Sequence, residues 1–203
     1  MGGSTLARIS QFRTRGAGRS ARGCARLYYV RHGLSDHASN ARPAPFSGET
    51  ACLVRGLGGP LTSYVGAGRE VLEGLGFRVV LHEMTVSPKA LELCAVIVAH
   101  SAGAVPALAT PGPRLIFVID GFATFLQHCP TEATCTNFYN PGDVLGGTLA
   151  GAQNINCFTA CGVLDAVPVL AHATMPASGE VWRTISRQIE QHAIPVAANE
   201  RSS

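Results

Sequence analysis

The sequence has few charged side chains and no apolar run long enough to cross a bilayer. Of its 203 residues only 14% are charged, whereas 46% are hydrophobic. No stretch reaches the roughly 18 consecutive apolar residues that a membrane-spanning helix needs. A largely disordered chain would be poor in apolar residues, so this composition excludes a disordered protein. It indicates a single globular domain with a substantial core.

Acidic residues are missing from residues 1–31, which carry seven arginines. Subtracting these from the 16 basic residues leaves 9 basic against 13 acidic residues in the remainder, so nucleic acid is not an expected partner. The first 30 residues also lack the apolar segment of a secretory signal, and we expect a cytoplasmic protein. An organelle transit peptide or a start codon assigned too far upstream would give the same composition.

The distribution of these residue types divides the chain into three parts. Residues 1–48 are predicted to be a disordered, arginine-rich segment and linker, 49–196 the folded domain, and 197–203 a flexible tail.

The chain lacks C-x-x-C pairs although it has seven cysteines, an odd number. No zinc or other metal site is therefore predicted. Free buried thiols in a reducing compartment are the expected state. If the protein were exported, Cys129 with Cys135, or Cys157 with Cys161, could close small disulfide loops.

Near-continuous apolar segments alternate with segments of helical periodicity. Strands are predicted at 51–54, 77–81, 95–99, 115–121 and 136–140, and helices at 63–75, at 88–94 and around Val181 to Ile189. A glycine-punctuated loop is expected at 141–154. Apolar strands separated by helices predict an α/β fold, with a mostly parallel sheet covered by helices on both faces.

One of these strands ends abruptly in the small-residue turn Ala99-His100-Ser101-Ala102-Gly103. A strand, sharp turn and helix in this order pushes the central serine hydroxyl above the sheet. The residues two before and two after it must be small, because the backbone doubles back there. The pattern is a variant of G-x-S-x-G with Ala99 at the leading glycine position.

A glycine-rich loop follows the first predicted strand, with the sequence R-G-L-G-G-P-L at residues 55–61. Its backbone N–H groups can face a ligand without obstruction. Neither G-x-G-x-x-G nor a Walker lysine accompanies it, so a nucleotide site and a nucleotide cofactor are not predicted.

The turn at Ser101, the pattern R-G-L-G-G-P-L-x-S-Y and the run N-F-Y-x-x-G-D-x-L-G-G-x-L-x-G-A-x-N resemble small single-domain bacterial members of the α/β-hydrolase superfamily. The resemblance covers about residues 51–194. It implies a minimal α/β-hydrolase fold without a large cap domain and an esterase, lipase or thioesterase activity that needs no cofactor. The chain order Ser101, Asp120, His172 is that of the superfamily's nucleophile, acid and base.

The resemblance also implies the remaining site residues. The oxyanion hole would come from Ala102, Leu57 and Gly58, and the substrate contacts from Gly56, Gly59 and His100. Two other acids, Asp143 and Asp165, are alternatives to Asp120 as the triad acid, and two histidines, His128 and His192, are weaker candidates for the base. The expected partner is a small-molecule ester or thioester, and the oligomeric state stays open.

Two other functions are carried as alternatives. The stretch Arg31-His32-Gly33 resembles the R-H-G signature of histidine phosphatases, in which His32 would accept the phosphoryl group. That family also needs a second histidine at a strand end, for which His100 is the candidate. The other alternative is a non-catalytic α/β-hydrolase-fold protein that binds a ligand or partner.

Overall fold

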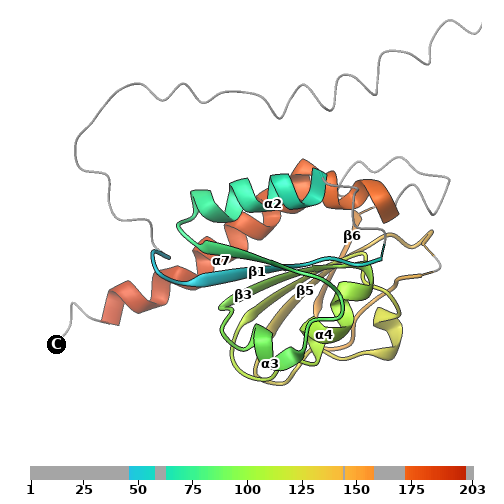
Figure 1. Cartoon of the computed structure of the whole chain (residues 1–203), viewed down its shortest axis with the longest axis horizontal. Helices are drawn as coiled ribbons and strands as arrows, with labels where there is room; N and C mark the ends of the chain where they lie inside the picture. The colour runs from blue at the N-terminus through green and yellow to red at the C-terminus, as the bar shows by residue number, and fades with distance from the viewer. Residues whose placement is uncertain (1–45, 58–62, 144, 158–171, 200–203) are drawn as a thin grey trace, which may run out of the picture. The chain divides into compact units, whose positions relative to one another are not determined.

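A six-stranded, all-parallel sheet with helices on both faces forms the protein (Figure 1), as the sequence predicts. The structure is a computed structural model and describes residues 46–57, 63–143, 145–157 and 172–199. The spatial order is β2-β1-β3-β4-β5-β6. The strands are β1 (Thr50–Val54), β2 (Arg78–His82), β3 (Val96–His100), β4 (Leu115–Ile119), β5 (Thr134–Tyr139) and β6 (Gln153–Asn156).

One face of the sheet is covered by α2 (Ser63–Gly74) and α7 (Gly179–Asn199) (Figure 1). The apolar positions predicted for the last helix are buried there, with Trp182 only 1% exposed. The two helices pack closely because Gly68 has no side chain: a Cβ at this position would lie 2.5 Å from the Trp182 ring. Helix α2 ends at a glycine as predicted, since Gly76 has φ +100° and its N–H donates to Glu73 O at 2.9 Å.

The opposite face is covered by the short helices α3 (Pro88–Leu91) and α4 (Ala104–Leu108). Their buried side chains form a second core with alternate residues of the central strands, among them Ile97 and Val118. Both faces of the sheet are therefore dry, which explains the near-continuous apolar strands. None of the helices in the described ranges is long and apolar enough to cross a membrane.

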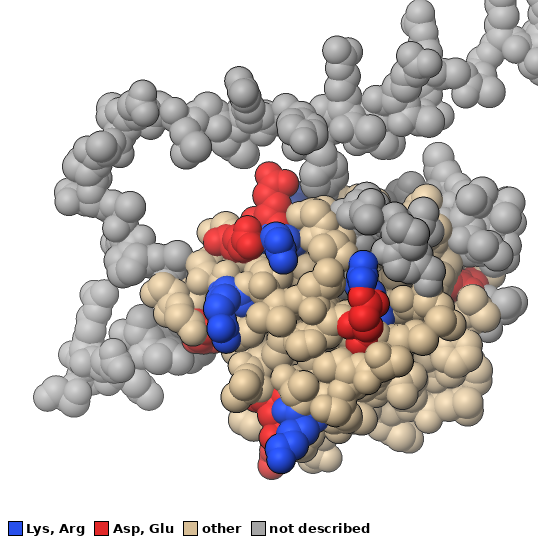
Figure 2. Space-filling view, viewed as in Figure 1, with Lys and Arg blue, Asp and Glu red and all other residues tan. Residues whose placement is uncertain are grey.

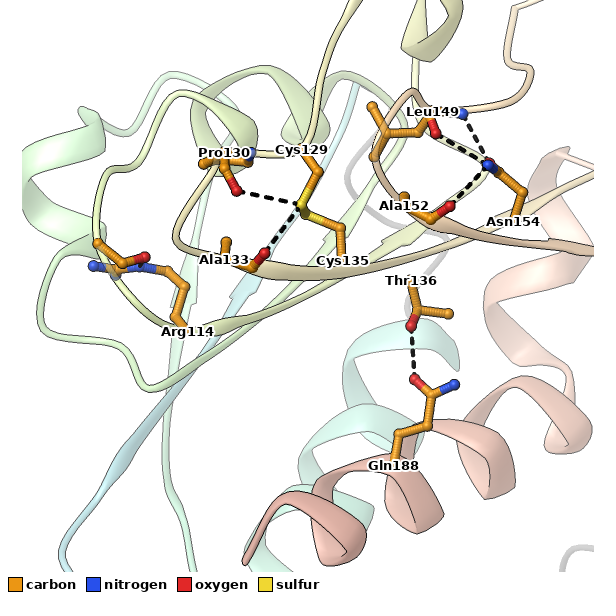
Figure 3. Close-up of a disulfide and its surroundings, with 11 residues drawn as sticks. Arg114, Cys129, Pro130, Ala133, Cys135, Thr136, Leu149, Ala152, Asn154 and Gln188 are labelled. Carbon is orange, nitrogen blue, oxygen red and sulfur yellow. Dashed lines mark hydrogen bonds between the residues drawn. A yellow bond between two sulfur atoms is a disulfide. The ribbon is translucent and has the colours of Figure 1, made fainter.

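The sixth strand is a correction to the sequence analysis, in which residues 141–154 are a loop and no strand follows 136–140. Strand β6 begins at Gln153 and runs parallel to β5. Its sequence Q-N-I-N has no apolar run, because an edge strand is half exposed. Hydrogen bonds hold this strand where apolar contacts are few: the Asn154 side chain bonds to Leu149 and Ala152 of the preceding loop (Figure 3).

The first strand and the last helix give the extent of the described fold. Strand β1 starts at Thr50, while α7 continues past residue 196 to Asn199. Residues 1–45, for which disorder was predicted and which include His32, lie outside the described residues.

The cysteines are a second correction, since the free thiols expected from the sequence are oxidised. Disulfides join Cys52 to Cys94 and Cys129 to Cys135. The first connects β1 to the chain just before β3, and the second closes the small loop that leads into β5 (Figure 3). Cys157 is disulfide-bonded as well, whereas Cys161 lies outside the described residues. Spacing alone could not reveal the first pair, because the sheet brings together cysteines 42 residues apart.

The two disulfides should differ in how much they stabilise the fold. A cross-link removes more chain entropy from the unfolded state when it closes a longer loop. For separations of 42 and 6 residues, this relation gives about 4 and about 2 kcal/mol. The double variant Cys52→Ala/Cys94→Ala should therefore lose more free energy of unfolding in urea than Cys129→Ala/Cys135→Ala. Equal or reversed losses would contradict this account, and a reducing agent should lower the stability of the wild type.

Candidate active site

Ser101 occupies a tight turn between β3 and α4. Its φ of 54° lies in the left-handed region, which costs a residue with a side chain about 1–2 kcal/mol. The 3-10 turn η2 (Ser101–Gly103) follows directly and leads into α4. Such strain persists only where the surrounding structure enforces it, and it often marks a functional position.

Two glycines make this turn possible. A Cβ at Gly103 would lie 2.5 Å from Val54 O, and a Cβ at Gly56 would lie 2.5 Å from the Cβ of Ser101. The elbow is thus pressed against the end of β1. Ala99, the departure from the G-x-S-x-G pattern, is fully buried within β3 and its methyl group is accommodated in the core.

The segment after β1 also lies beside the N–H of Ala102. A Cβ at Gly56 would be 3.0 Å from Ala102 N, so the backbone at Gly56 and Leu57 borders the position expected for an oxyanion. Leu57 itself is 75% exposed. The other expected members of this loop, Gly58 and Gly59, lie outside the described residues.

His172 opens a short helical turn and is held by two carboxylates. Its Nδ1 lies 3.0 Å from Asp120 Oδ2 and 2.7 Å from Asp143 Oδ2. The structure therefore brings the expected histidine to the expected acid, and it brings the alternative acid Asp143 closer still. Asp165 lies outside the described residues.

The two acids come from neighbouring strands. Asp120 directly follows β4, has φ 47°, is fully buried, and donates its N–H to Phe138 O at 2.8 Å. Asp143 follows β5, is 6% exposed, and accepts the Leu145 N–H at 2.8 Å through Oδ1. Although Asp143 lies in the loop expected from the sequence, these bonds hold it in place.

Burial and hydrogen bonding shift the pKa values of this cluster. Burial raises the pKa of Asp120 to about 6, although its bond to His172 acts in the opposite direction. Burial also acts to raise the pKa of Asp143, but hydrogen bonds from Asp120, Leu145 N and His172 outweigh it and leave the pKa lowered. The hydrogen bond to Asp120 is the main reason that the pKa of His172 is raised, with Asp143 adding to the effect.

His100 supports His172 from the elbow strand. Its Nε2 lies 3.1 Å from the His172 carbonyl oxygen, and the two rings are 5.0 Å apart. Burial, followed by the neighbouring His172, lowers the pKa of His100 to about 4, so the ring is neutral near pH 7. A neutral ring that donates Nε2–H to this carbonyl fixes the backbone of His172. The sequence analysis expects His100 to contact the substrate and does not predict this bond.

The two weaker histidine candidates make other contacts. His128 pairs through its backbone with Ala150, and exposed His192 bonds through Nδ1 to Gln188 O of its own helix. Across the described ranges no hydrogen bond joins Ser101 Oγ to His172. Such bonds commonly tighten only when substrate is bound.

The cluster around His172 also has the residue types of a metal site. Donor atoms of Asp120, Asp143 and His172 lie within 4.8 Å of one another, a spacing that a metal ion can span. In the arrangement observed, Nδ1 of the imidazole lies at hydrogen-bond distance from both carboxylates, so a proton on Nδ1 lies between the two acids without any metal ion.

Comparison with known proteins gives no further guide: no family model matches the chain, and neither does any curated protein. The site must therefore be interpreted from its own geometry. The main residue that the sequence analysis undervalued is Asp143. The signal that could have identified it is the turn Asn140-Pro141-Gly142 at the carboxyl end of β5, which delivers Asp143 to the same sheet edge as Asp120.

Proposed function

We propose that this protein is a serine hydrolase of the α/β-hydrolase type, which cleaves an ester or thioester through an acyl-enzyme. The observation that carries the proposal is the strained left-handed Ser101 at the carboxyl end of β3, in a sheet whose neighbouring strands deliver the acids that hold His172. A serine hydroxyl is a poor nucleophile without a base, and an oriented imidazole is the group that activates it.

In the proposed reaction, Ser101 Oγ attacks the substrate carbonyl carbon while His172 Nε2 takes the hydroxyl proton. The N–H of Ala102 and backbone N–H groups of the loop beginning at Gly56 stabilise the oxyanion. The tetrahedral intermediate collapses and His172 protonates the leaving alcohol or thiol. Water then attacks the acyl-serine, His172 again acts as base, and the acid is released.

Exposed apolar side chains indicate the kind of substrate. All but one of the large exposed hydrophobic residues in the described ranges follow the carboxyl ends of strands, the edge at which Ser101 lies. We call these residues the apolar rim: Leu57, Val105, Phe122, Phe125, Leu126 and Leu145. Phe122 adjoins the nucleophile directly, since its N–H donates to Ser101 O at 3.0 Å.

The same edge carries little net charge. Arg55 and Glu83, which follow β1 and β2, form an ion pair with each other. Residues 101–113, 121–131 and 139–157 contain no Lys, Arg or Glu, and their one Asp is the buried Asp143. On the face drawn in Figure 2, basic and acidic side chains lie in small mixed groups and leave a wide uncharged area. An uncharged apolar rim favours a neutral substrate with an apolar acyl chain over a phosphorylated one.

This substrate class predicts a selective effect of Leu126→Ser. Serine at this position would bury less of the acyl chain. If the chain then loses about 1.4 kcal/mol of binding free energy, kcat/KM falls about tenfold. We expect about that loss on p-nitrophenyl octanoate and little change on p-nitrophenyl acetate. Leu93→Ser is the matched control, because Leu93 is 80% and Leu126 74% exposed but Leu93 lies outside the rim. Equal losses on both esters, or the same loss in the control, would contradict an acyl-binding rim.

The disulfides bear on the compartment in which the enzyme acts. Structural disulfides form and persist in oxidising compartments and are rare in the cytosol. With Cys52–Cys94 and Cys129–Cys135 both oxidised, we favour an oxidising compartment over the cytoplasm expected from the sequence.

A panel of soluble substrates tests the proposed activity. Wild-type protein should hydrolyse p-nitrophenyl acetate and an acyl thioester, and should not hydrolyse p-nitrophenyl phosphate. Hydrolysis of the phosphate alone would favour the histidine-phosphatase alternative, whose His32 lies outside the described residues. No hydrolysis of any of the three would favour the non-catalytic binding protein.

A further inference from the structure

The imidazole of His172 has more acid partners than a serine triad requires. A triad needs one carboxylate, which holds the histidine in the correct tautomer. Here Nδ1 carries one hydrogen in the tautomer that acts as base, and two carboxylate oxygens lie within reach of it, at 2.7 and 3.0 Å. The shorter distance belongs to Asp143, one of the two acids that the sequence offers as alternatives to Asp120.

Neither acid is a chance neighbour, because each is fixed by its own strand. Asp120 is anchored through its N–H to Phe138 O, and Asp143 is held by two bonds, N–H to Asn140 O at 3.0 Å and Oδ1 to Leu145 N at 2.8 Å. The backbone of each acid is therefore fixed by contacts that do not involve the other acid, and the Asp143 carboxylate has its own bond to Leu145 N.

Two buried carboxylates beside each other cannot both stay ionised without cost. The titratable groups that face the pair are His172 and, through it, His100 from β3. His100 is neutral near pH 7, so His172 is the cation-forming group that the pair contacts. Asp120, which is fully buried and whose Oδ1 has no hydrogen-bond partner, bears more of this cost: burial raises its pKa to about 6, whereas the pKa of Asp143 is lowered. Near pH 7 both carboxylates are therefore ionised and can stabilise the imidazolium of His172.

We propose that Asp143 is a second positioning residue for His172, and that Asp120 and Asp143 act as a pair in which either carboxylate alone keeps the imidazole oriented. The proposal deepens the proposed function and rests on it for its kinetic test. It follows from one nitrogen lying within hydrogen-bond distance of two acids whose backbones are held by separate turns, after β4 and after β5. It predicts that either acid can partly replace the other, which is impossible in a triad with one acid.

The kinetic test compares Asp120→Asn, Asp143→Asn and the double variant on p-nitrophenyl acetate. Each single variant should lose about tenfold in kcat, and the double variant 10³- to 10⁴-fold, with KM little changed, since the wrong histidine tautomer then prevails. Glu180→Gln on α7 is the control for loss of one negative charge away from the site, and melting temperatures check the fold. The proposal would be wrong if either single variant lost as much kcat as the double variant. It would also be wrong if the loss of kcat in the double variant equalled the product of the two single losses.

A second readout does not depend on activity. The pKa of His172, followed by NMR in the Ser101→Ala background, should fall in each single variant and fall furthest in the double, because each carboxylate stabilises the imidazolium. In active protein the acidic limb of kcat/KM should move to lower pH in the same order. If Asp143→Asn leaves the His172 pKa unchanged, Asp143 has only a structural role and the proposal is wrong. If the pKa shifts as expected but the wild type has no Ser101-dependent activity, the proposed function fails while the pair stands.

Discussion

Replacing Ser101 with alanine should lower kcat for p-nitrophenyl acetate by about 10⁶-fold, the loss seen when the nucleophile of a serine–histidine unit is removed. The substitution deletes one oxygen at a turn that is only 8% exposed, and alanine meets the same left-handed strain as serine. The melting temperature should therefore change little. The measurement is steady-state kinetics together with thermal unfolding.

Ser87→Ala is the matched control for this prediction. Ser87 is exposed and caps α3 by accepting the Ala90 N–H at 3.4 Å, and in the described part of the chain it makes no hydrogen bond with a residue of the proposed site. Its loss should cost about 1 kcal/mol of stability and leave kcat unchanged. Near-normal turnover in Ser101→Ala would remove Ser101 from the mechanism.

Replacing His172 with alanine should be as damaging as replacing Ser101, again about 10⁶-fold in kcat, because the two residues act as one unit. The double variant Ser101→Ala/His172→Ala should then be no slower than either single variant. His192→Ala, on the exposed side of α7, should leave the rate unchanged. Losses that multiply in the double variant would show that serine and histidine act separately.

The sequence was sufficient to predict the central part of this fold. Apolar segments at 51–54, 95–99 and 115–121 identify strands buried on both faces, and Gly103 identifies the sharp turn after Ser101. These features follow from local rules, since a buried parallel strand must be apolar and a backbone pressed against β1 must lack a side chain. The edge strand β6 was missed because half exposure removes the apolar signal on which the prediction depends.

Contacts between distant residues could not be predicted in the same way. The pairing of Cys52 with Cys94 depends on two segments that only the assembled sheet brings together. The second acid on His172 depends on how the turn after β5 folds back, where Leu145 N holds Asp143 at the site. Sequence patterns describe one element at a time, and both features arise where several elements meet.

The most direct test of the central claim is to label the protein with a fluorophosphonate, a reagent that reacts with activated serines, and to locate the adduct by mass spectrometry. Wild-type protein should carry one phosphonyl group per chain, on the peptide that contains Ser101, and lose ester hydrolysis in proportion to labelling. Labelling should be absent in Ser101→Ala and strongly slowed in His172→Ala. An active enzyme that stays unlabelled, or an adduct on any other residue, would contradict the assignment of Ser101 as the nucleophile.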